Sequence, residues 1–231
     1  MAMTLEQVVP WGRSLDEYRH MFDLSPTNLA SKILGCGDGP ASFNAELTAQ
    51  GGQVISVDPI YAYSREQIEA RVNATHTVVV TQVQQTLEDY RWTEFANPAA
   101  LGRHRLATMQ RFLADYAAGH RAGRYRVEAL PALSFADDTF DLALCSHFLF
   151  LYSEQLDYAF HRAGILELCR VAREVRIFPL LDLKCRLSQH LQPLCVALQQ
   201  QGYDARVVSV PYEFQRGGNQ MLQIARKRST Q

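Results

Sequence analysis

The apolar positions of this chain follow two periods in turn, and the alternation between them predicts its elements. Short apolar runs typical of buried strands are followed by segments whose apolar residues recur every three or four positions. The predicted strands lie at residues 32–34, 54–57, 124–130, 140–144, 175–180, 205–212 and 220–225. The predicted helices follow residues 42 and 64 and cover residues 154–171 and 187–198. Strands that alternate with helices in this way indicate an α/β fold.

The last two predicted strands differ from the others because no helix separates them. Residues 213–219 between them read EFQRGGN and contain the glycines and asparagine typical of a hairpin turn. A hairpin makes its two strands antiparallel. The sequence therefore predicts a doubly wound, mostly parallel sheet of seven strands in which the last strand is antiparallel.

A helical N-terminal segment is expected at residues 1–29. Ser14 and Glu17 have the spacing of a capping box, and Ser25 precedes a proline at the first position of a helix. These two signals predict two short helices before the first strand.

A helical insertion is expected after the second strand, at about residues 64–122. Leu106, Met109, Phe112 and Tyr116 have helical spacing there, whereas the three valines at 78–80 suit either a strand or a helix. We expect this insertion to act as a lid over a small substrate. Since no linker or repeat divides the sequence, we interpret residues 1–231 as a single domain.

Composition narrows the classes of function. The 231 residues include 23 basic and 24 acidic side chains, and this balance gives no general attraction to nucleic acid. The longest apolar run has 11 residues, at 142–152, which is too short for a membrane span. No secretion or transit signal is recognised, so a cytoplasmic location is expected. The five cysteines form no C-x-x-C pair, and neither a disulfide framework nor a metal site is predicted.

A glycine turn follows the first predicted strand, and an acid ends the second. Gly37 and Gly39 stand where a parallel α/β sheet brings backbone N–H groups to a ligand, and Asp58 follows Gly39 by 19 residues. A carboxylate in that place accepts hydrogen bonds from both hydroxyls of a ribose. Together these residues predict a nucleoside-binding site.

Two motifs resemble those of the class I S-adenosylmethionine-dependent methyltransferases. ILGCGDGPA at residues 33–41 resembles the first motif of that family, and LSFADDTFDL at residues 133–142 resembles its segment entering strand four. The resemblance covers about residues 30–60 and 124–226. It implies a seven-stranded fold, S-adenosyl-L-methionine as cofactor and a small molecule as methyl acceptor. The binding residues it indicates are Gly35, Cys36, Gly37, Gly39, Asp58, Pro59, Leu133, Ser134 and Ser146.

The sequence departs from that family at two acids. Gly35 or, in a shifted register, Ile33 stands where the family has an acid that assists the methionine ammonium. Ala129 and Leu130 stand where an acid often accepts from the adenine amine, and Glu128 is adjacent. These departures suggest weaker cofactor binding or a substitute contact from the N-terminal segment.

Candidate residues for the acceptor follow from position and chemistry. His147 at the end of the fourth strand is the candidate general base, because imidazole titrates near neutrality; its alternative role is to line the pocket or bond to the backbone. Tyr152, Arg216 and Asn219 are candidate substrate contacts, and packing is the simpler interpretation of Tyr152.

A basic surplus lies between residues 103 and 126, opposed there only by Asp115. It suits an anionic substrate. The simpler interpretation is the solvated face of an amphipathic helix. The residues are Arg103, His104, Arg105, Arg111, His120, Arg121, Arg124 and Arg126.

The sequence therefore favours a methyltransferase that acts on an oxygen, sulfur or carbon atom of a small molecule. The alternative is a non-catalytic or regulatory module that binds S-adenosylmethionine or S-adenosylhomocysteine through a degenerate first motif. An NAD-dependent oxidoreductase is disfavoured because the glycine spacing is wrong, with Ser42 three residues after Gly39. A nucleic-acid methyltransferase is disfavoured by the net charge.

Overall fold

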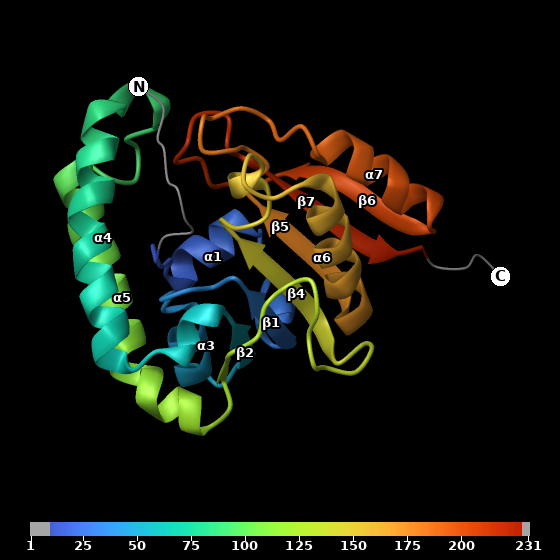
Figure 1. Cartoon of the computed structure of the whole chain (residues 1–231), viewed down its shortest axis with the longest axis horizontal. Coiled ribbons are helices and arrows are strands. Elements are labelled where there is room, and N and C mark those ends of the chain that lie inside the picture. Colours follow the sequence, from blue (N-terminus) through green and yellow to red (C-terminus); the bar gives the residue numbers. More distant parts are fainter. Residues whose placement is uncertain (1–9, 228–231) are drawn as a thin grey trace.

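A seven-stranded sheet forms the centre of the computed structural model, which describes residues 10–227 (Figure 1). Residues 1–9 of the expected N-terminal helical segment lie outside the described range. The strands are β1 (Lys32–Cys36), β2 (Gln53–Val57), β3 (Tyr125–Arg126), β4 (Phe140–Ser146), β5 (Ala172–Phe178), β6 (Tyr203–Ser209) and β7 (Gln220–Arg226). The helices are α1 (Leu15–Met21), α2 (Pro26–Leu29), α3 (Phe43–Ala49), α4 (Arg65–Gln85), α5 (Pro98–Arg121), α6 (Tyr158–Val171) and α7 (Leu191–Gln200). Short 3-10 turns lie at Pro59–Ala62, Leu87–Asp89 and Phe150–Tyr152.

The strand order is β3-β2-β1-β4-β5-β7-β6. The first five strands in this order are parallel, and β7 runs antiparallel to both β5 and β6. The expectation of a mostly parallel seven-stranded sheet with an antiparallel last strand is confirmed. β1 pairs with both β2 and β4, so its carboxyl end lies between theirs, where a doubly wound sheet binds its ligand.

The third strand is much shorter than the sequence predicts. The expected strand at 124–130 is wrong beyond Arg126, because the chain turns there: the Glu128 N–H donates to the Arg126 carbonyl at 3.0 Å. This turn brings Glu128 to the carboxyl edge of the sheet instead of extending the ladder. β5 also begins earlier than expected, at Ala172, directly where α6 ends.

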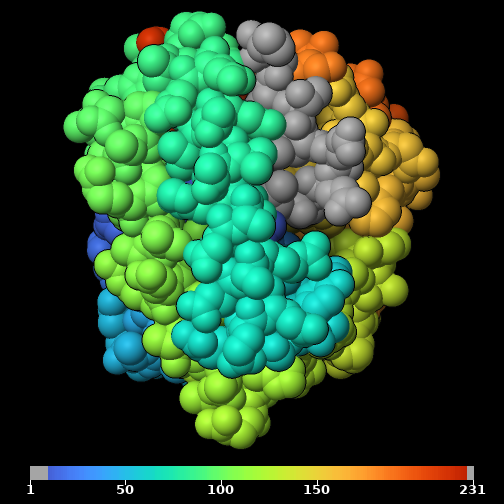
Figure 2. Space-filling view, turned by 60° about the vertical axis from the view of Figure 1, so that its left-hand side comes forward, coloured from blue at the N-terminus to red at the C-terminus, as the bar shows by residue number. Residues whose placement is uncertain are grey.

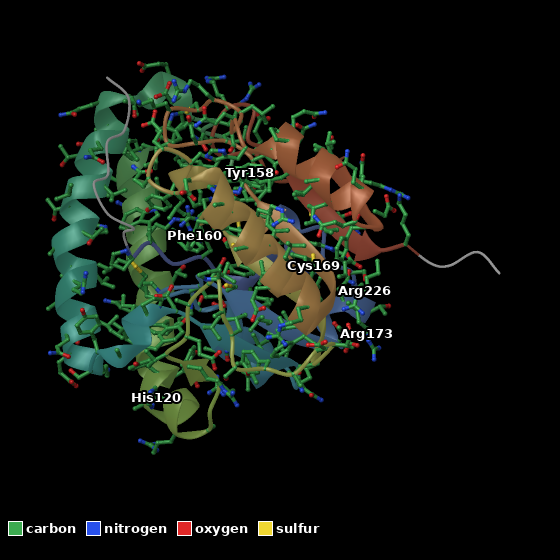
Figure 3. All side chains as sticks on the ribbon, turned by 45° about the vertical axis from the view of Figure 1, so that its right-hand side comes forward. His120, Tyr158, Phe160, Cys169, Arg173 and Arg226 are labelled. Atoms are coloured by element: carbon green, nitrogen blue, oxygen red, sulfur yellow. The ribbon has the colours of Figure 1, made fainter. Side chains whose placement is uncertain are left out.

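Helices cover both faces of the sheet, as its apolar strands require. α6 and α7 pack on one face through Ile165, Leu168 and Leu194, while α1 and α3 pack on the other through Tyr18 and Phe43. Figure 3 shows Tyr158, Phe160 and Cys169 along α6. It also shows Arg173 near the start of β5 and Arg226 at the end of the neighbouring strand β7. The two cores hold the central strands in place from both sides.

The insertion between β2 and β3 consists of two long helices, α4 and α5, which pack against each other; we call this pair the arm (Figure 1). The helical interpretation of the insertion is confirmed, and the valines at 78–80 belong to α4, with Val79 buried. Ser64 begins α4 with a capping box to Gln67. The arm forms much of the face seen in Figure 2. Of the helices within residues 10–227, none has the length and hydropathy that crossing a bilayer requires.

Candidate cofactor and substrate site

A cavity of about 440 Å³ lies at the carboxyl ends of β1, β2 and β4. One side, the sheet wall, consists of residues 36–39, 57–60, 128–130 and 146–148. The opposite side, the arm wall, consists of Arg71, Val79, Val83 and Leu101 of the arm with Tyr90, Tyr212, Phe214, Gln215 and Gly218. The cavity therefore joins the edge of the sheet to the arm.

The glycine turn forms the floor of the sheet wall. Gly37 and Gly39 have φ values of 68° and 53°, a region that side chains other than glycine rarely adopt. The Gly37 N–H donates to the Val57 carbonyl at 2.9 Å, which ties the turn to β2. A Cβ on Gly37 would lie 3.1 Å from the Phe148 side chain. Glycine is thus required here both for the backbone conformation and for the close approach of the β4 loop.

Asp58 connects the glycine turn to the end of β2. Its Oδ2 accepts from the Gly39 N–H at 2.9 Å, and its Oδ1 accepts from the Ile60 N–H at 2.8 Å. Burial raises the pKa of this carboxyl, and the two N–H groups partly offset that effect. Each oxygen keeps a further lone pair, so a half-buried, oriented carboxylate lines the cavity.

Asp38 occupies the space that a side chain at Gly35 would fill. A Cβ on Gly35 would overlap the Asp38 carboxylate, which accepts from the Tyr18 hydroxyl at 2.7 Å and from the Ser56 hydroxyl at 2.6 Å. Burial, with a smaller contribution from Asp58, raises the pKa of Asp38 to about 6. Asp38 lines the cavity whereas Gly35 does not. A carboxylate from the turn therefore lies at the cavity, beside the position where β1 has a glycine.

Glu128, rather than Leu133 or Ser134, lies at the cavity. The N–H and the hydroxyl of Ser134 both donate to the Glu128 carboxylate, at 2.8 and 2.7 Å. The Leu133 N–H donates to Glu167 on α6. The sequence placed Leu133 and Ser134 among the cofactor residues, and the structure places them behind the wall because the chain turns after Arg126. Ser134 instead orients Glu128.

His147 lies at the cavity in a left-handed backbone conformation, with φ of 51°. Its Nδ1 lies 2.9 Å from the Ser146 hydroxyl. Burial first, and then Arg13 and Arg105, lower the pKa of His147 well below its usual value. The imidazole is therefore neutral at pH 7. Ser146 also lines the cavity, as do Cys36 and Pro59.

The three candidate substrate residues separate into two groups. Tyr152 lines the cavity. Arg216 lies outside it, because its Nε donates to the Glu88 carbonyl and its N–H to the Asp89 carbonyl. Asn219 also lies outside, next to β7, where its carbonyl accepts from Val210. The segment from Glu213 to Asn219 reaches the cavity through Phe214, Gln215 and Gly218 instead.

A buried charge cluster joins the N-terminal segment to the arm, and sequence reasoning missed it. Glu17 on α1 accepts from Arg105 on α5 at 2.5 Å, lies 3.2 Å from His104 and 3.9 Å from Arg13. Burial alone would raise the pKa of Glu17, but these three neighbours hold it well below its usual range. The expectation that the basic residues form a solvated face is wrong for Arg105, which is 0% exposed.

Other members of that basic group behave as expected or pair locally. Arg103 and Arg121 are exposed, and Figure 3 shows His120 at the edge of the molecule. Arg124 is largely buried and pairs with Asp115 at 2.7 Å. In the sequence, only the four-residue spacing of Arg13 and Glu17 hints at the buried cluster.

The arm wall is largely apolar, in contrast to the sheet wall. Tyr90 stacks on Phe214 with ring centroids 4.8 Å apart, and Val79, Val83 and Leu101 pack beside them. All five cysteines are free thiols, and residues 10–227 contain no group of three or more side chains suited to hold a metal ion. The arm wall thus offers shape and apolar surface, with few polar contacts.

Comparison with known proteins gives one close match in sequence. The chain is 34% identical over 225 residues to uncharacterized protein MJ0045 of Methanocaldococcus jannaschii, which covers 97% of this chain and 99% of that protein. No protein-family model matches the chain.

Solved structures superpose on parts of this one at low sequence identity. Magnesium protoporphyrin IX methyltransferase of Synechocystis PCC 6803 with bound SAM is 16% identical, with 87% of this chain and 73% of that chain covered and a TM-score of 0.44. A SAM-dependent methyltransferase from Methanosarcina mazei is 16% identical, with 88% and 98% covered and a TM-score of 0.45. By its sequence match over nearly all of both proteins, the chain belongs to the family of MJ0045.

Proposed function

We propose that this protein transfers the methyl group of S-adenosyl-L-methionine to a small molecule. The observation that carries the proposal is the wall shared by the glycine turn and Asp58. Gly37, Gly39 and Asp58 lie on one side of a cavity of about 440 Å³, a volume within the range of small-molecule sites. A tight glycine turn lets the protein backbone approach a nucleoside closely, and the oriented carboxylate beside it can accept hydrogen bonds from the ribose hydroxyls.

The residues present fit the ribose, the methionine ammonium and the base of the cofactor. Asp58 would accept from the two ribose hydroxyls, and the backbone at Gly37 and Gly39 would lie against the sugar and the amino-acid tail. Asp38 would accept from the methionine ammonium, in place of the acid that β1 lacks. Ile60 and Phe148 offer apolar surface for the base. In this proposal Asp38, three residues after Gly35, supplies the carboxylate that the first motif lacks.

The cofactor brings an already activated methyl group, so this chain needs only to align an acceptor and exclude water. Alignment of reacting groups contributes up to about 7–11 kcal/mol in ideal cases. His147 is neutral and accepts a proton or hydrogen bond, but its lowered pKa makes it a weak base. The site therefore suits an acceptor whose nucleophilic atom loses its proton readily or has already lost it.

The arm would provide the acceptor side of the site. Val79, Val83 and Tyr90 line the cavity opposite the glycine turn, and the aromatic side chain of Phe214 completes that surface. We propose that the arm acts as a lid over the acceptor, because its apolar wall excludes water from the reacting atoms. This role favours a small acceptor over a macromolecule.

Calorimetric titration with S-adenosylhomocysteine tests cofactor binding, and incubation with methyl-labelled S-adenosylmethionine and metabolite extract tests transfer. The proposal predicts binding to the wild type, weaker binding to Asp58→Asn, and label in a low-molecular-weight product. Binding without any transfer would favour the non-catalytic module. Absence of binding would contradict both functions.

A further inference from the structure

The cluster around Glu17 contains more positive than negative charge. Arg13 is 9% exposed, Arg105 is 0% exposed, and Glu17, with 4% exposed, is the carboxylate that both contact. The Tyr212 hydroxyl donates to Oε1 of Glu17 at 3.1 Å, whereas Arg105 donates to Oε2. Two buried guanidinium groups therefore share one carboxylate.

The other groups that face Arg13 do not balance this excess. Tyr18 on α1 and Tyr212 before β7 are neutral phenols, since burial raises both of their pKa values. His147 on the β4 loop is neutral for the reason given above. Glu94, the other acid whose charge acts on the cluster, is exposed to solvent. Among the described residues of this cluster, two buried guanidinium groups therefore face a single buried carboxylate.

Arg13 is the member of the cluster that faces the cavity. Its Nη1 donates to the carbonyl of Trp11, while its buried Nε has no hydrogen-bond partner among the described residues. Glu17 lies 3.9 Å from that Nε, which is too far for a hydrogen bond. Arg105 also has two buried nitrogens without a partner among the described residues, but it bonds Glu17 directly and does not line the cavity. The guanidinium of Arg13 is thus available to a ligand bound in the cavity.

The backbone of Arg13 is fixed beside the glycine turn. Its carbonyl accepts from the Ser42 N–H at 3.0 Å, and a Cβ on the preceding Gly12 would overlap the backbone of Pro40. This packing fixes the backbone of Arg13, and the contact of Nη1 with the Trp11 carbonyl orients the guanidinium while its Nε stays without a partner among the described residues. A preorganised donor with free capacity is typical of a binding group rather than of a structural ion pair.

We propose that Arg13 receives a carboxylate of the molecule bound in the cavity. Burying an uncompensated charge is costly, and a ligand carboxylate supplies both the missing charge and a two-oxygen acceptor for the guanidinium. Two sources share this chemistry. One is the methionine carboxylate of the cofactor, which rests on the proposed function, and the other is a carboxylate on an apolar acceptor lying against the arm wall, which does not.

Paired ligands that differ in the carboxylate test the proposal by calorimetric titration. S-adenosylmethionine is compared with its decarboxylated analogue, and 3-phenylpropanoate with 3-phenylpropanamide, on the wild type, Arg13→Gln, Arg13→Lys and the control Arg19→Gln, an exposed residue on α1. We expect Arg13→Gln to weaken a carboxylate-bearing ligand at least tenfold and to leave its carboxylate-free partner unchanged. Arg13→Lys should restore part of the affinity.

The pair that responds identifies the source of the carboxylate. Loss confined to S-adenosylmethionine assigns it to the cofactor, and loss confined to 3-phenylpropanoate assigns it to the acceptor. If no S-adenosyl ligand binds the wild type while 3-phenylpropanoate binds through Arg13, the proposed function fails and this inference stands. If Arg13→Gln binds every ligand as the wild type does, or the wild type binds neither carboxylate, the inference is overturned.

The thermal midpoint of the ligand-free protein separates a binding role from a structural one. Removing an unmatched buried charge should leave the midpoint of Arg13→Gln unchanged or raise it, because no good ion pair is lost. A structural role for Arg13 predicts a clear fall in the midpoint together with equal losses for both ligands of each pair. That result would contradict the proposal.

Discussion

The two walls of the cavity are built by different means. On the sheet wall, Asp38 and Asp58 are each held by two hydrogen bonds to neighbouring groups, and the glycine turn is tied to β2. On the arm wall, Val79, Val83 and Leu101 pack among apolar neighbours, and Tyr90 stacks on Phe214. The first wall therefore fixes polar groups in position, whereas the second fixes only a shape.

This difference indicates a division of labour between the walls. Hydrogen-bonded carboxylates discriminate strongly, because a ligand that lacks the matching donors leaves them unpaired. Apolar packing discriminates weakly, by about 1–3 kcal/mol for each methylene. The sheet wall thus suits one invariant ligand, and the arm wall suits a partner that can vary. The charge cluster at Glu17 joins the two walls.

Breaking the junction between the walls should have the largest effect. Glu17→Gln leaves Arg13 and Arg105 buried without their carboxylate, so the free energy of unfolding should fall by about 3–5 kcal/mol. Chemical denaturation measures this change. Asp16→Asn, at an exposed neighbour on α1, is the control and should change stability little. A loss under about 1 kcal/mol for Glu17→Gln would show that the cluster does not hold the arm in place.

Removing the charge at the end of β2 should affect the sheet wall next. Asp58→Asn should weaken S-adenosylhomocysteine about 100-fold, equivalent to about 2.8 kcal/mol, because two charge-assisted hydrogen bonds to the ribose are lost. Calorimetric titration checks this, with Asp16→Asn again as control. Equal affinities for Asp58→Asn and wild type would remove the proposed ribose contact.

Acidification should separate binding from stability through Asp38. Its pKa of about 6 lies above the ordinary value of 3.8, so the folded protein takes up a proton first as the pH falls. This uptake makes the fold more stable toward low pH, since the folded state binds the proton more tightly. Protonation also removes the charge offered to an ammonium, so affinity for S-adenosylhomocysteine should fall about fivefold from pH 6 to pH 5, as the charged fraction of Asp38 falls.

Titrations over that pH range check the effect, and Asp38→Asn should give an affinity independent of pH between 5 and 7. A wild-type affinity that does not change below pH 6 would show that Asp38 holds no ammonium.

Two glycines with left-handed backbones sharpen the contrast between site and scaffold. Gly37 faces the cavity at φ of 68°, and Gly51 has open space around it at φ of 88°. Alanine at either position should cost about 1–2 kcal/mol of stability through the backbone. Only Gly37→Ala should also weaken S-adenosylhomocysteine, because its new Cβ lies against Phe148 and displaces the turn. Equal binding by both variants would contradict this assignment.

The smallest effect on cofactor affinity is expected from the arm wall. Val79→Ala removes apolar surface opposite the glycine turn and should change the affinity for S-adenosylhomocysteine by no more than about 0.5 kcal/mol, roughly twofold. Titration of this variant beside Asp58→Asn measures the difference directly. A loss for Val79→Ala as large as that for Asp58→Asn would mean that the cofactor lies against the arm.

The parts of this molecule that sequence predicts are those set by local patterns. The strands, the glycine turn and Asp58 are visible because each depends on residues within one strand–turn–helix unit, and Asp58 lies where the second strand ends. The antiparallel last strand followed from the absence of a helix between the last two predicted strands. Periodicity alone left the valines at 78–80 undecided, and packing of α4 on α5 made them helical.

The parts that sequence did not predict depend on distant contacts. Arg105 lies 88 residues from Glu17, so a local count of charges placed it on a solvated face. The sequence assigns no role to Asp38, because only the folded turn brings its carboxylate over Gly35. The motif predicts Leu133 and Ser134 among the cofactor residues, whereas the short β3 brings Glu128 to the cavity and leaves those two residues outside its lining.

The central claim is that the glycine turn and Asp58 hold a nucleoside cofactor at the sheet wall. Titration of S-adenosylhomocysteine against the wild type and Asp58→Asn, with NAD as a second ligand, tests this claim most directly. The account predicts that S-adenosylhomocysteine binds the wild type, that NAD does not compete with it, and that the substitution weakens binding about 100-fold. No binding of S-adenosylhomocysteine, or binding indifferent to Asp58, would contradict it.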